Sequence, residues 1–278
     1  MEKEFQCPGL EDSRPGIGEL KFGKKAFKES SFMYKAAQLN RDNKDSIFIK
    51  VPINYNEEFL AFGGDVYWTG ENYIMDGYKY KDFNEIEEIL TVQYEREKFR
   101  TVLGCIEQAS NKDNLVLCVQ GPFSVLCSLI NFSVVARNLK KGQELIEKVI
   151  SHISDVLRQY IQDALCMNIR MISLADPAGS IYVMGEDRFK RFCGEPLIRL
   201  IHSIEPDLNG TCIHLCGKNC IDLKKCGLLV PHDIAYHGTY GAGLMNVLEK
   251  QHITLFGDGC INCENRIVDC IHEMQIVG

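Results

Sequence analysis

The chain has 278 residues, of which 45% are hydrophobic and 25% are charged, and its formal net charge is −7. This composition is typical of a globular protein with one large α/β domain or two small ones. The negative charge, in a sequence without a cluster of arginine and lysine, argues against nucleic acid as a partner.

The cysteines and the N-terminal residues bear on the cellular compartment. The chain begins without the apolar core of a signal peptide. Its longest apolar stretch, residues 123–136, is interrupted by serine and asparagine and is too short to span a bilayer. In a chain without an export signal, 13 cysteines are expected to be reduced thiols. We therefore expect a cytoplasmic protein that does not associate with a membrane.

Strand-like runs and helical patterns alternate along most of the chain. Residues 1–45 are expected to form an N-terminal arm, which should be loosely ordered over residues 1–30 because this part is rich in Gly, Lys and Glu and contains prolines. Beyond it, apolar runs typical of buried strands alternate with apolar residues spaced three or four apart, as in helices. The expected elements are strand 46–51, helix 84–110, strand 115–119, helix 143–166, strand 169–174, helix 186–205, strand 211–215 and the shorter strands 226–230 and 253–256.

This alternation predicts a parallel sheet that is buried on both faces. Polar and glycine-rich motifs follow four of the strands, namely Gly121-Pro122, Asp176-Pro177, His214/Cys216 and Cys260. In (β/α)8 barrels, active sites are built at the carboxyl ends of the strands. A doubly wound sheet also places ligands there, but no strand is followed by the Gly-x-Gly-x-x-Gly phosphate motif. We therefore predict a (β/α)8 TIM-type barrel over residues 46–278.

The segment Ile213-His214-Leu215-Cys216-Gly217 places two soft metal ligands at the end of a predicted strand. Residues two apart in a strand point to the same side, so the His214 imidazole and the Cys216 thiol should face one point in space. Cys260 ends a similar run of apolar residues and glycines further along the chain. One histidine and two cysteines, with a fourth position open, are typical of a catalytic zinc site rather than a structural one.

The sequence alone leaves other assignments of these residues open. His214 and Cys216 also fit a buried core, because a free cysteine behaves as a small hydrophobic residue. As the third ligand, Cys260 competes with two other cysteines. Cys263 lies three residues beyond it, and Cys220 lies one helical turn beyond Cys216.

Five segments together resemble the uroporphyrinogen decarboxylase superfamily, and within it the zinc-dependent methylcobamide:thiol and corrinoid-linked methyltransferases. They are Glu58-Phe59-Leu60-Ala61-Phe62-Gly63-Gly64, Gln120-Gly121-Pro122-Phe123-Ser124, Ser173-Leu174-Ala175-Asp176-Pro177-Ala178-Gly179-Ser180, Ile213-His214-Leu215-Cys216-Gly217 and Gly257-Asp258-Gly259-Cys260. The resemblance implies that His214, Cys216 and Cys260 ligate zinc. It also implies that Asp176 lies at the cavity in a catalytic role. The decarboxylase's N-terminal arginine-rich substrate motif has no counterpart before Ile47, which speaks against porphyrin decarboxylation.

Two departures from the family pattern bear on the fold. The interval from Cys216 to Cys260 is shorter than is typical of the family by about one strand–helix unit. The N-terminal region is also abbreviated. The expected barrel is therefore shortened or irregular, and its closure by a partner chain, as in a homo-oligomer, stays open.

Further residues are candidates for the site. Asp176 precedes a proline at a strand end, where a carboxylate also serves to cap the next turn. Tyr236, His237 and Tyr240 lie in a glycine-rich loop around residues 237–243, beside the expected site. We expect these three side chains to line a substrate pocket or to act as a lid.

The resemblance implies zinc as the metal and, as partners, a corrinoid protein that carries cobalamin and a small thiol or methylated molecule. Zinc bound by an imidazole and two thiolates lowers the pKa of a coordinated thiol far below about 8.5 and so provides a thiolate. The predicted function is methyl transfer between the corrinoid and this substrate, in either direction. The alternatives are a non-catalytic binding or regulatory member of the fold with a structural metal site, and a porphyrin-type decarboxylase.

Overall fold

A computed structural model describes residues 16–54, 56–109, 114–167, 169–250 and 253–277. Within these ranges, no helix is long and apolar enough to cross a lipid bilayer.

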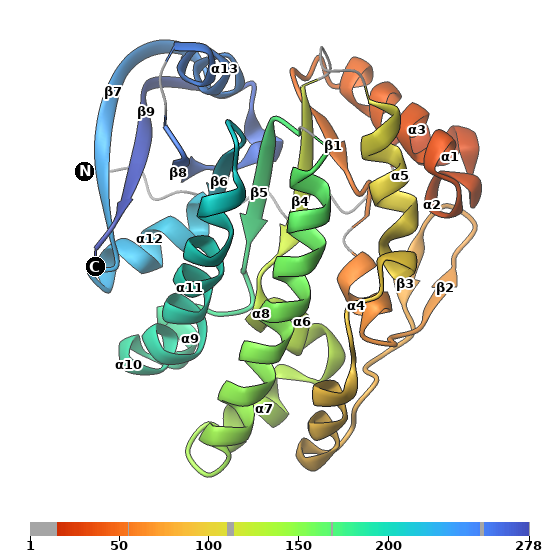
Figure 1. Cartoon of the computed structure of the whole chain (residues 1–278), viewed down its shortest axis with the longest axis vertical. Coiled ribbons are helices and arrows are strands. Elements are labelled where there is room, and N and C mark those ends of the chain that lie inside the picture. The colour runs from red at the N-terminus through yellow and green to blue at the C-terminus, as the bar shows by residue number, and fades with distance from the viewer. Residues whose placement is uncertain (1–15, 55, 110–113, 168, 251–252, 278) are drawn as a thin grey trace.

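The described chain is built on one seven-stranded sheet with the strand order β1-β4-β5-β6-β8-β9-β7 (Figure 1). The strands are β1 (Ile49–Val51), β4 (Leu115–Gln120), β5 (Met171–Ala175), β6 (Cys212–Cys216), β7 (Leu229–Thr239), β8 (Leu255–Gly259) and β9 (Ile267–Ile276). The first five in this order run parallel, whereas β9 is antiparallel to both β8 and β7. A separate hairpin pairs β2 (Val66–Trp68) with β3 (Tyr73–Met75).

Five of the six strands expected from apolar runs form within three residues of their predicted ends. The sixth, expected at 226–230, is wrong in its bounds, because β7 begins at Leu229 and runs to Thr239, and β9 is not predicted. All five residues of β6 and the first five of β4 are buried, as expected for strands that are covered on both faces. The predicted TIM-type barrel class is confirmed in an irregular form. Five parallel strands build its wall, and β9 and β7 form an antiparallel extension beyond β8.

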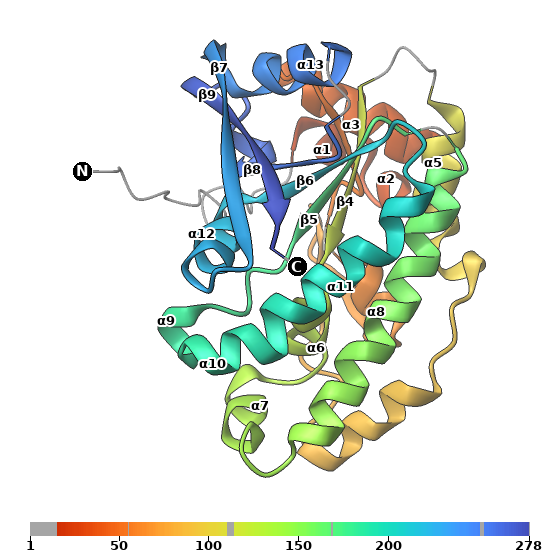
Figure 2. The same ribbon diagram turned by 60° about the vertical axis from the view of Figure 1, so that its left-hand side comes forward.

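Helices cover the outer side of the parallel strands (Figures 1 and 2). Those before β4 are α1 (Ile17–Phe22), α2 (Lys25–Lys28), α3 (Ser30–Asn43), α4 (Glu57–Ala61), the 3₁₀ helices η1 (Phe83–Thr91) and η2 (Arg96–Phe99), and α5 (Arg100–Gln108). Those between β4 and β6 are α6 (Pro122–Leu129), α7 (Phe132–Asn138), α8 (Gln143–Leu165), α9 (Ile181–Met184), α10 (Glu186–Phe189), the π-helical η3 (Lys190–Gly194), α11 (Glu195–Ile204) and η4 (Glu205–Asp207). The last are α12 (Gly217–Lys225), α13 (Tyr240–Lys250) and η5 (Ile261–Cys263). Of these, α13 lies on the inner side instead, where it packs with Phe48, Cys118 and Phe256.

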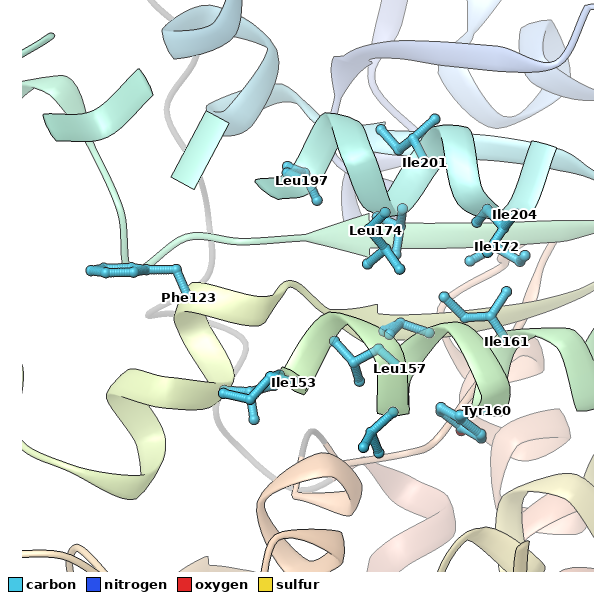
Figure 3. Close-up of a cluster of buried hydrophobic side chains, with 14 of the residues drawn as sticks. Phe123, Ile153, Leu157, Tyr160, Ile161, Ile172, Leu174, Leu197, Ile201 and Ile204 are labelled. Atoms are coloured by element: carbon cyan, nitrogen blue, oxygen red, sulfur yellow. The ribbon is translucent and has the colours of Figure 1, made fainter. Parts of the chain in front are cut away.

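The main core lies between the sheet and its outer helices (Figure 3). Helix α8 ends within one residue of the predicted boundary at 166, and its apolar stripe, which includes Ile153, Leu157 and Ile161, is fully buried. The side chains of Ile172 and Ile201, from β5 and α11, are buried in the same cluster. Burying one such side chain stabilises the fold by about 1.5–3 kcal/mol, so this stripe positions the wall that carries the site.

The helix predicted over residues 84–110 is wrong in its middle. The chain forms η1, then an extended segment at residues 92–95, then η2 and α5. Tyr94 in the extended segment stacks on Phe99 and donates a hydrogen bond of 2.6 Å to the Asp163 carboxylate on α8. These tertiary contacts outweigh the local helical preference.

The N-terminal arm is also more ordered than expected over its described part. Residues 17–43 are mostly helical, and α3 buries Met33, Ala36 and Ala37. The Asn40 side chain ties α3 to α1, since it donates to the Glu19 carboxylate at 2.8 Å and accepts from the Gly18 amide at 2.9 Å. The expected loose order is therefore wrong for residues 17–28, while residues 1–15 lie outside the described part.

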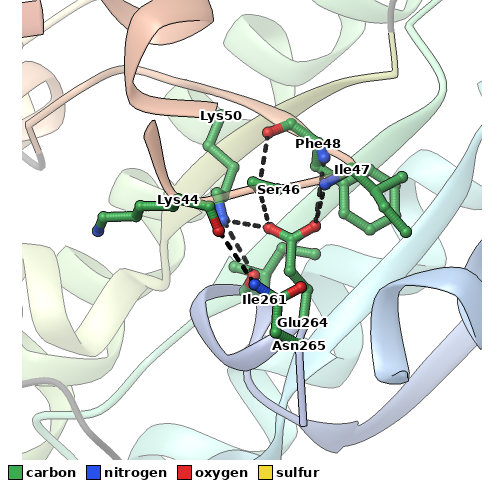
Figure 4. A network of polar contacts seen from close by, with 8 residues as sticks. All are labelled: Lys44, Ser46, Ile47, Phe48, Lys50, Ile261, Glu264 and Asn265. Carbon is green, nitrogen blue, oxygen red and sulfur yellow. Dashed lines mark hydrogen bonds and ion pairs between the residues drawn. The ribbon is translucent and has the colours of Figure 1, made fainter. Parts of the chain in front are cut away.

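One buried carboxylate joins the two sides of the barrel where no strand pairing does so in the described part (Figure 4). Glu264, in the loop after β8, accepts hydrogen bonds from the backbone amides of Ile47 at 2.7 Å and Phe48 at 3.3 Å. It also accepts from the Ser46 hydroxyl and forms an ion pair of 2.7 Å with Lys50. The loop between β8 and β9 is thereby fastened to β1.

The variant Glu264→Gln tests this closure. It removes the negative charge beside Lys50, whose side chain is only 19% exposed, and breaking a buried ion pair in this way costs about 3 kcal/mol. We expect the free energy of unfolding, measured with urea, to fall by about this amount. Glu97→Gln, which breaks an exposed pair with Arg100, is the matched control and should change little. Equal stability of the two variants would show that Glu264 does not hold the barrel together.

Candidate active site

A cavity of about 720 Å³ opens inside the barrel. Alternate residues of successive strands line it, namely Phe48 and Lys50, Cys118 and Gln120, Ser173 and Ala175, and His214 and Cys216. This alternation follows from the strand period of two, which sends every second side chain inward. Cys260 and Ile261 from the loop after β8, and Glu19, Asn40 and Arg41 from the N-terminal helices, complete part of the wall.

His214 is completely buried and both of its ring nitrogens have partners. Nδ1 lies 3.0 Å from the Ser173 hydroxyl, and Nε2 lies 3.1 Å from the Tyr240 hydroxyl. Burial, together with the charge of Lys50, lowers the pKa of His214 to about 4. The imidazole is therefore neutral at pH 7, which is the form that ligates metals.

Cys216 and Cys260 approach the same cavity from neighbouring strands. Cys216 is the last residue of β6 and pairs in register with Gly259, the last residue of β8. The register shifts between His214 and Cys216, and the backbone at Asp258 adopts a left-handed conformation (φ 67°). In a regular strand, the side chains of residues 259 and 260 would point to opposite faces of the sheet. Because β8 ends at Gly259, this constraint does not apply to Cys260, and both Cys216 and Cys260 line the cavity.

Neither rival for the third ligand lines the cavity. The Cys220 thiol donates to the carbonyl of Leu215 at 3.5 Å, and it lies against the position where Gly257 lacks a side chain. Cys263 is in η5, outside the lining set. The geometry therefore favours Cys260 over both.

The three predicted ligands meet on one cavity without forming a compact cluster. In the described ranges, a single group of three or more potential ligand atoms lies within 4.8 Å of one another, and it consists of other residues (Asp233, Cys270 and His272). A neutral imidazole and two thiols fit a soft divalent metal ion by donor type. The Tyr240 hydroxyl forms a hydrogen bond with His214 Nε2. Burial raises the pKa of Tyr240 well above the ordinary value, so this side chain is a neutral phenol. Coordination through Nε2 requires this hydroxyl to withdraw.

Asp176 caps a helix and does not line the cavity. Its carboxylate accepts hydrogen bonds from the amides of Phe123 (3.2 Å) and Ser124 (2.6 Å), at the start of α6, and from the Ser124 hydroxyl (2.6 Å). Burial raises its pKa to about 6, although these hydrogen bonds act in the opposite direction. The contacts favour a capping role over the catalytic role, although the element capped is α6 and not the next turn, as the sequence suggested.

The prediction that Tyr236, His237 and Tyr240 lie in a loop is wrong. Residues 229–239 are β7 and residues 240–250 are α13, and none of the three side chains lines the cavity. His237 is exposed and pairs with Asp269 on β9 at 2.9 Å. Tyr240 takes part in the site through its hydrogen bond with His214. Tyr236 and His237 lie away from the cavity because β7 pairs with β9, and no local sequence pattern specifies this antiparallel pairing.

Two buried glutamates, Glu57 and Glu58, were not among the predicted site residues, although Glu58 opens one of the segments that resemble the family. Burial raises the pKa of Glu57 to about 8, with a further contribution from Glu58, and raises the pKa of Glu58 to about 7. Glu58 accepts from the backbone amide of Gln120 at 3.1 Å through one oxygen, and its other oxygen has no hydrogen-bond partner in the described structure. Adjacent glutamates are usually solvent-exposed, so only their position before a run of apolar residues hinted at burial.

Comparisons with known proteins agree with this architecture. The family model for uroporphyrinogen decarboxylase (URO-D) matches residues 59–230. Among solved structures, a methyltransferase from Methanosarcina mazei superposes with a TM-score of 0.62 at 19% sequence identity, covering 77% of this chain and 67% of the other. At this identity the likeness shows the fold. A search of curated proteins finds no match.

The raised pKa of Glu58 predicts a pH-dependent cost to stability. In the unfolded chain this carboxyl ionises near pH 4.5, whereas in the folded chain it keeps its proton up to about pH 7. The contribution of Glu58 to the free energy of unfolding therefore becomes less favourable as pH rises between these values. Glu58→Gln, which mimics the protonated form, should be more stable than the wild type by about 3 kcal/mol at pH 8 and by little at pH 5, since one pKa unit is about 1.4 kcal/mol.

Urea unfolding at the two pH values measures this difference. The exposed Glu87→Gln is the control and should show the same small effect at both. A stability difference between Glu58→Gln and the wild type that does not grow with pH would contradict the assignment of a protonated Glu58.

Proposed function

The chain belongs to the uroporphyrinogen decarboxylase family, and we propose that it is a zinc-dependent methyltransferase. It moves a methyl group between the corrinoid of a partner protein and a small thiol or methylated small molecule. The observation that carries the proposal is the convergence of His214, Cys216 and Cys260 on one cavity at the carboxyl ends of parallel strands. The methyltransferase from Methanosarcina mazei, which has the same fold, adds support.

His214, Cys216 and Cys260 would hold the metal. When bound, zinc supplies a Lewis-acidic centre that lowers the pKa of a coordinated thiol and makes a thiolate available at neutral pH. His214 needs to lose no proton to ligate, because its pKa is about 4. The two cysteine thiols must each release one proton.

Neighbouring residues prepare this donor set. Ser173 fixes the orientation of the His214 ring through Nδ1, as hydrogen-bonded partners of ligating histidines do. The Tyr240 hydroxyl hydrogen-bonds Nε2 and also donates to the Gly257 carbonyl at 3.3 Å, so it would keep one partner if a metal ion took its place at Nε2. Apolar lining residues such as Phe48, Val119 and Ile261 exclude water from the transferring group.

Decarboxylation of a porphyrin-type acid is less well supported. Several carboxylates on one substrate require several convergent cationic groups. The described lining contains Arg41, Lys44 and Lys50, of which Lys50 is paired with Glu264 and Arg41 with Asp42. The cavity therefore offers few cations for such a substrate.

One observation favours a second candidate, a non-catalytic member of the fold. Both nitrogens of His214 are already hydrogen-bonded, and the donors are not assembled into a compact cluster. In such a protein the histidine would serve as a core residue, and binding or regulation would be the function.

Metal binding by ligand variants tests the donor set on which the proposal depends. We expect His214→Ala, Cys216→Ser and Cys260→Ser each to lose one equivalent of zinc relative to the wild type. Cys263→Ser, the matched control, should retain it. Retention of all zinc by Cys260→Ser together with loss in Cys263→Ser would assign the third ligand to Cys263.

Methyl transfer itself is followed by cobalamin absorption, because the Co(I) and methyl-Co(III) forms differ in their spectra. The zinc-loaded protein should change these spectra in the presence of a methyl donor or a thiol acceptor. Thiol binding should also release close to one proton per zinc, measured by calorimetry in buffers of different ionisation enthalpy. A zinc-loaded, folded protein that shows neither effect would support the non-catalytic candidate.

A further inference from the structure

A second set of potential metal ligands lies outside the cavity, on the antiparallel pair of strands β7 and β9. Cys270 and His272 are two residues apart on β9, so they face the same side of the sheet. Asp233 on β7 is the direct cross-strand partner of His272. None of the three lines the barrel cavity.

The three side chains are already in contact. The Asp233 carboxylate lies 2.9 Å from His272 Nδ1, and the Cys270 thiol lies 3.4 Å from His272 Nε2. One potential ligand atom from each residue lies within 4.8 Å of the others. Ligand atoms on a tetrahedral zinc ion with bonds of about 2.0–2.3 Å lie closer together than this limit, so the three side chains would draw together on binding. His272 would ligate through one ring nitrogen, and the residue now on its other nitrogen, Asp233 or Cys270, would move onto the ion.

The surroundings are suited to a cation. Asp269 and Asp258 act on the Cys270 thiol electrostatically together with Asp233. Ala235, the cross-strand partner of Cys270, is small and exposed. His272 is 26% exposed and Asp233 71% exposed, so an ion can reach the group from solvent.

We propose that Cys270, His272 and Asp233 bind a zinc-class divalent metal ion at a second site, separate from the barrel cavity. A thiolate, an imidazole and a carboxylate are the donor types that zinc accepts, and three protein ligands leave a fourth position for water or another ligand. The ion would link β7, the edge strand of the sheet, to β9. This assignment does not depend on the function proposed for the cavity.

The test uses the full-length protein in a Cys216→Ser background, in which the cavity site is disabled. Zinc binding is measured by competition with a chromophoric chelator, and folding is checked by circular dichroism. We expect one equivalent of zinc in Cys216→Ser and none in Cys216→Ser/Cys270→Ser. Cobalt in place of zinc should give a thiolate-to-metal charge-transfer band that only the first variant shows.

The matched control is His237→Ala in the same background. His237 and Asp269 form a carboxylate–imidazole pair of 2.9 Å on the same two strands, and both side chains are at least 80% exposed. This variant should keep its equivalent of zinc. Loss of zinc in the control to the same extent as in the Cys270→Ser variant, retention in both, or no binding by Cys216→Ser at all would overturn the proposal.

Discussion

The carboxylate of Glu264 fastens the loop after β8 to β1, beside the cavity of the barrel. Regular barrels close by pairing the last strand with the first. Here the chain turns to the antiparallel β9 and β7 after β8, so the described sheet offers β1 no strand on that side. Glu264 instead accepts hydrogen bonds from the backbone amides of Ile47 and Phe48 and forms an ion pair with Lys50. A buried side chain therefore makes some of the contacts that a neighbouring strand would make in a regular barrel.

The same contact connects the fold to the candidate metal ligands. Glu264 follows Cys260 by four residues, and the carbonyl of Ile261 between them accepts from Lys50 at 3.2 Å. The backbone carbonyl of Glu264 also accepts from the Gly241 amide at 2.8 Å, next to the tyrosine that contacts His214. Cys260, Tyr240 and the wall formed by β1 are therefore positioned together. The shortened interval after Cys216 is compatible with an intact cavity because this loop takes over the closure.

The sequence was informative where local pattern determines structure. The apolar runs of β4, β5, β6 and β8 and the stripe of α8 place the parallel wall, and the spacing of His214 and Cys216 correctly predicts that both line one cavity. Prediction from the sequence failed where contacts between residues far apart in the chain determine the structure. No local pattern indicates the pairing of β7 with β9, which removes Tyr236 and His237 from the site, or the capping of α6 by Asp176. The burial of Glu58 has only a weak local signal, the apolar run that follows it.

Zinc coordination in the cavity tests the account most directly. X-ray absorption would be recorded on zinc-loaded Cys270→Ser protein, in which only the cavity site is expected to bind, with and without a small thiol. The account predicts one nitrogen and two sulfur donors with an exchangeable fourth ligand, and a third sulfur after thiol addition. A spectrum of four protein donors that thiol leaves unchanged, or of zinc without sulfur donors, would contradict it.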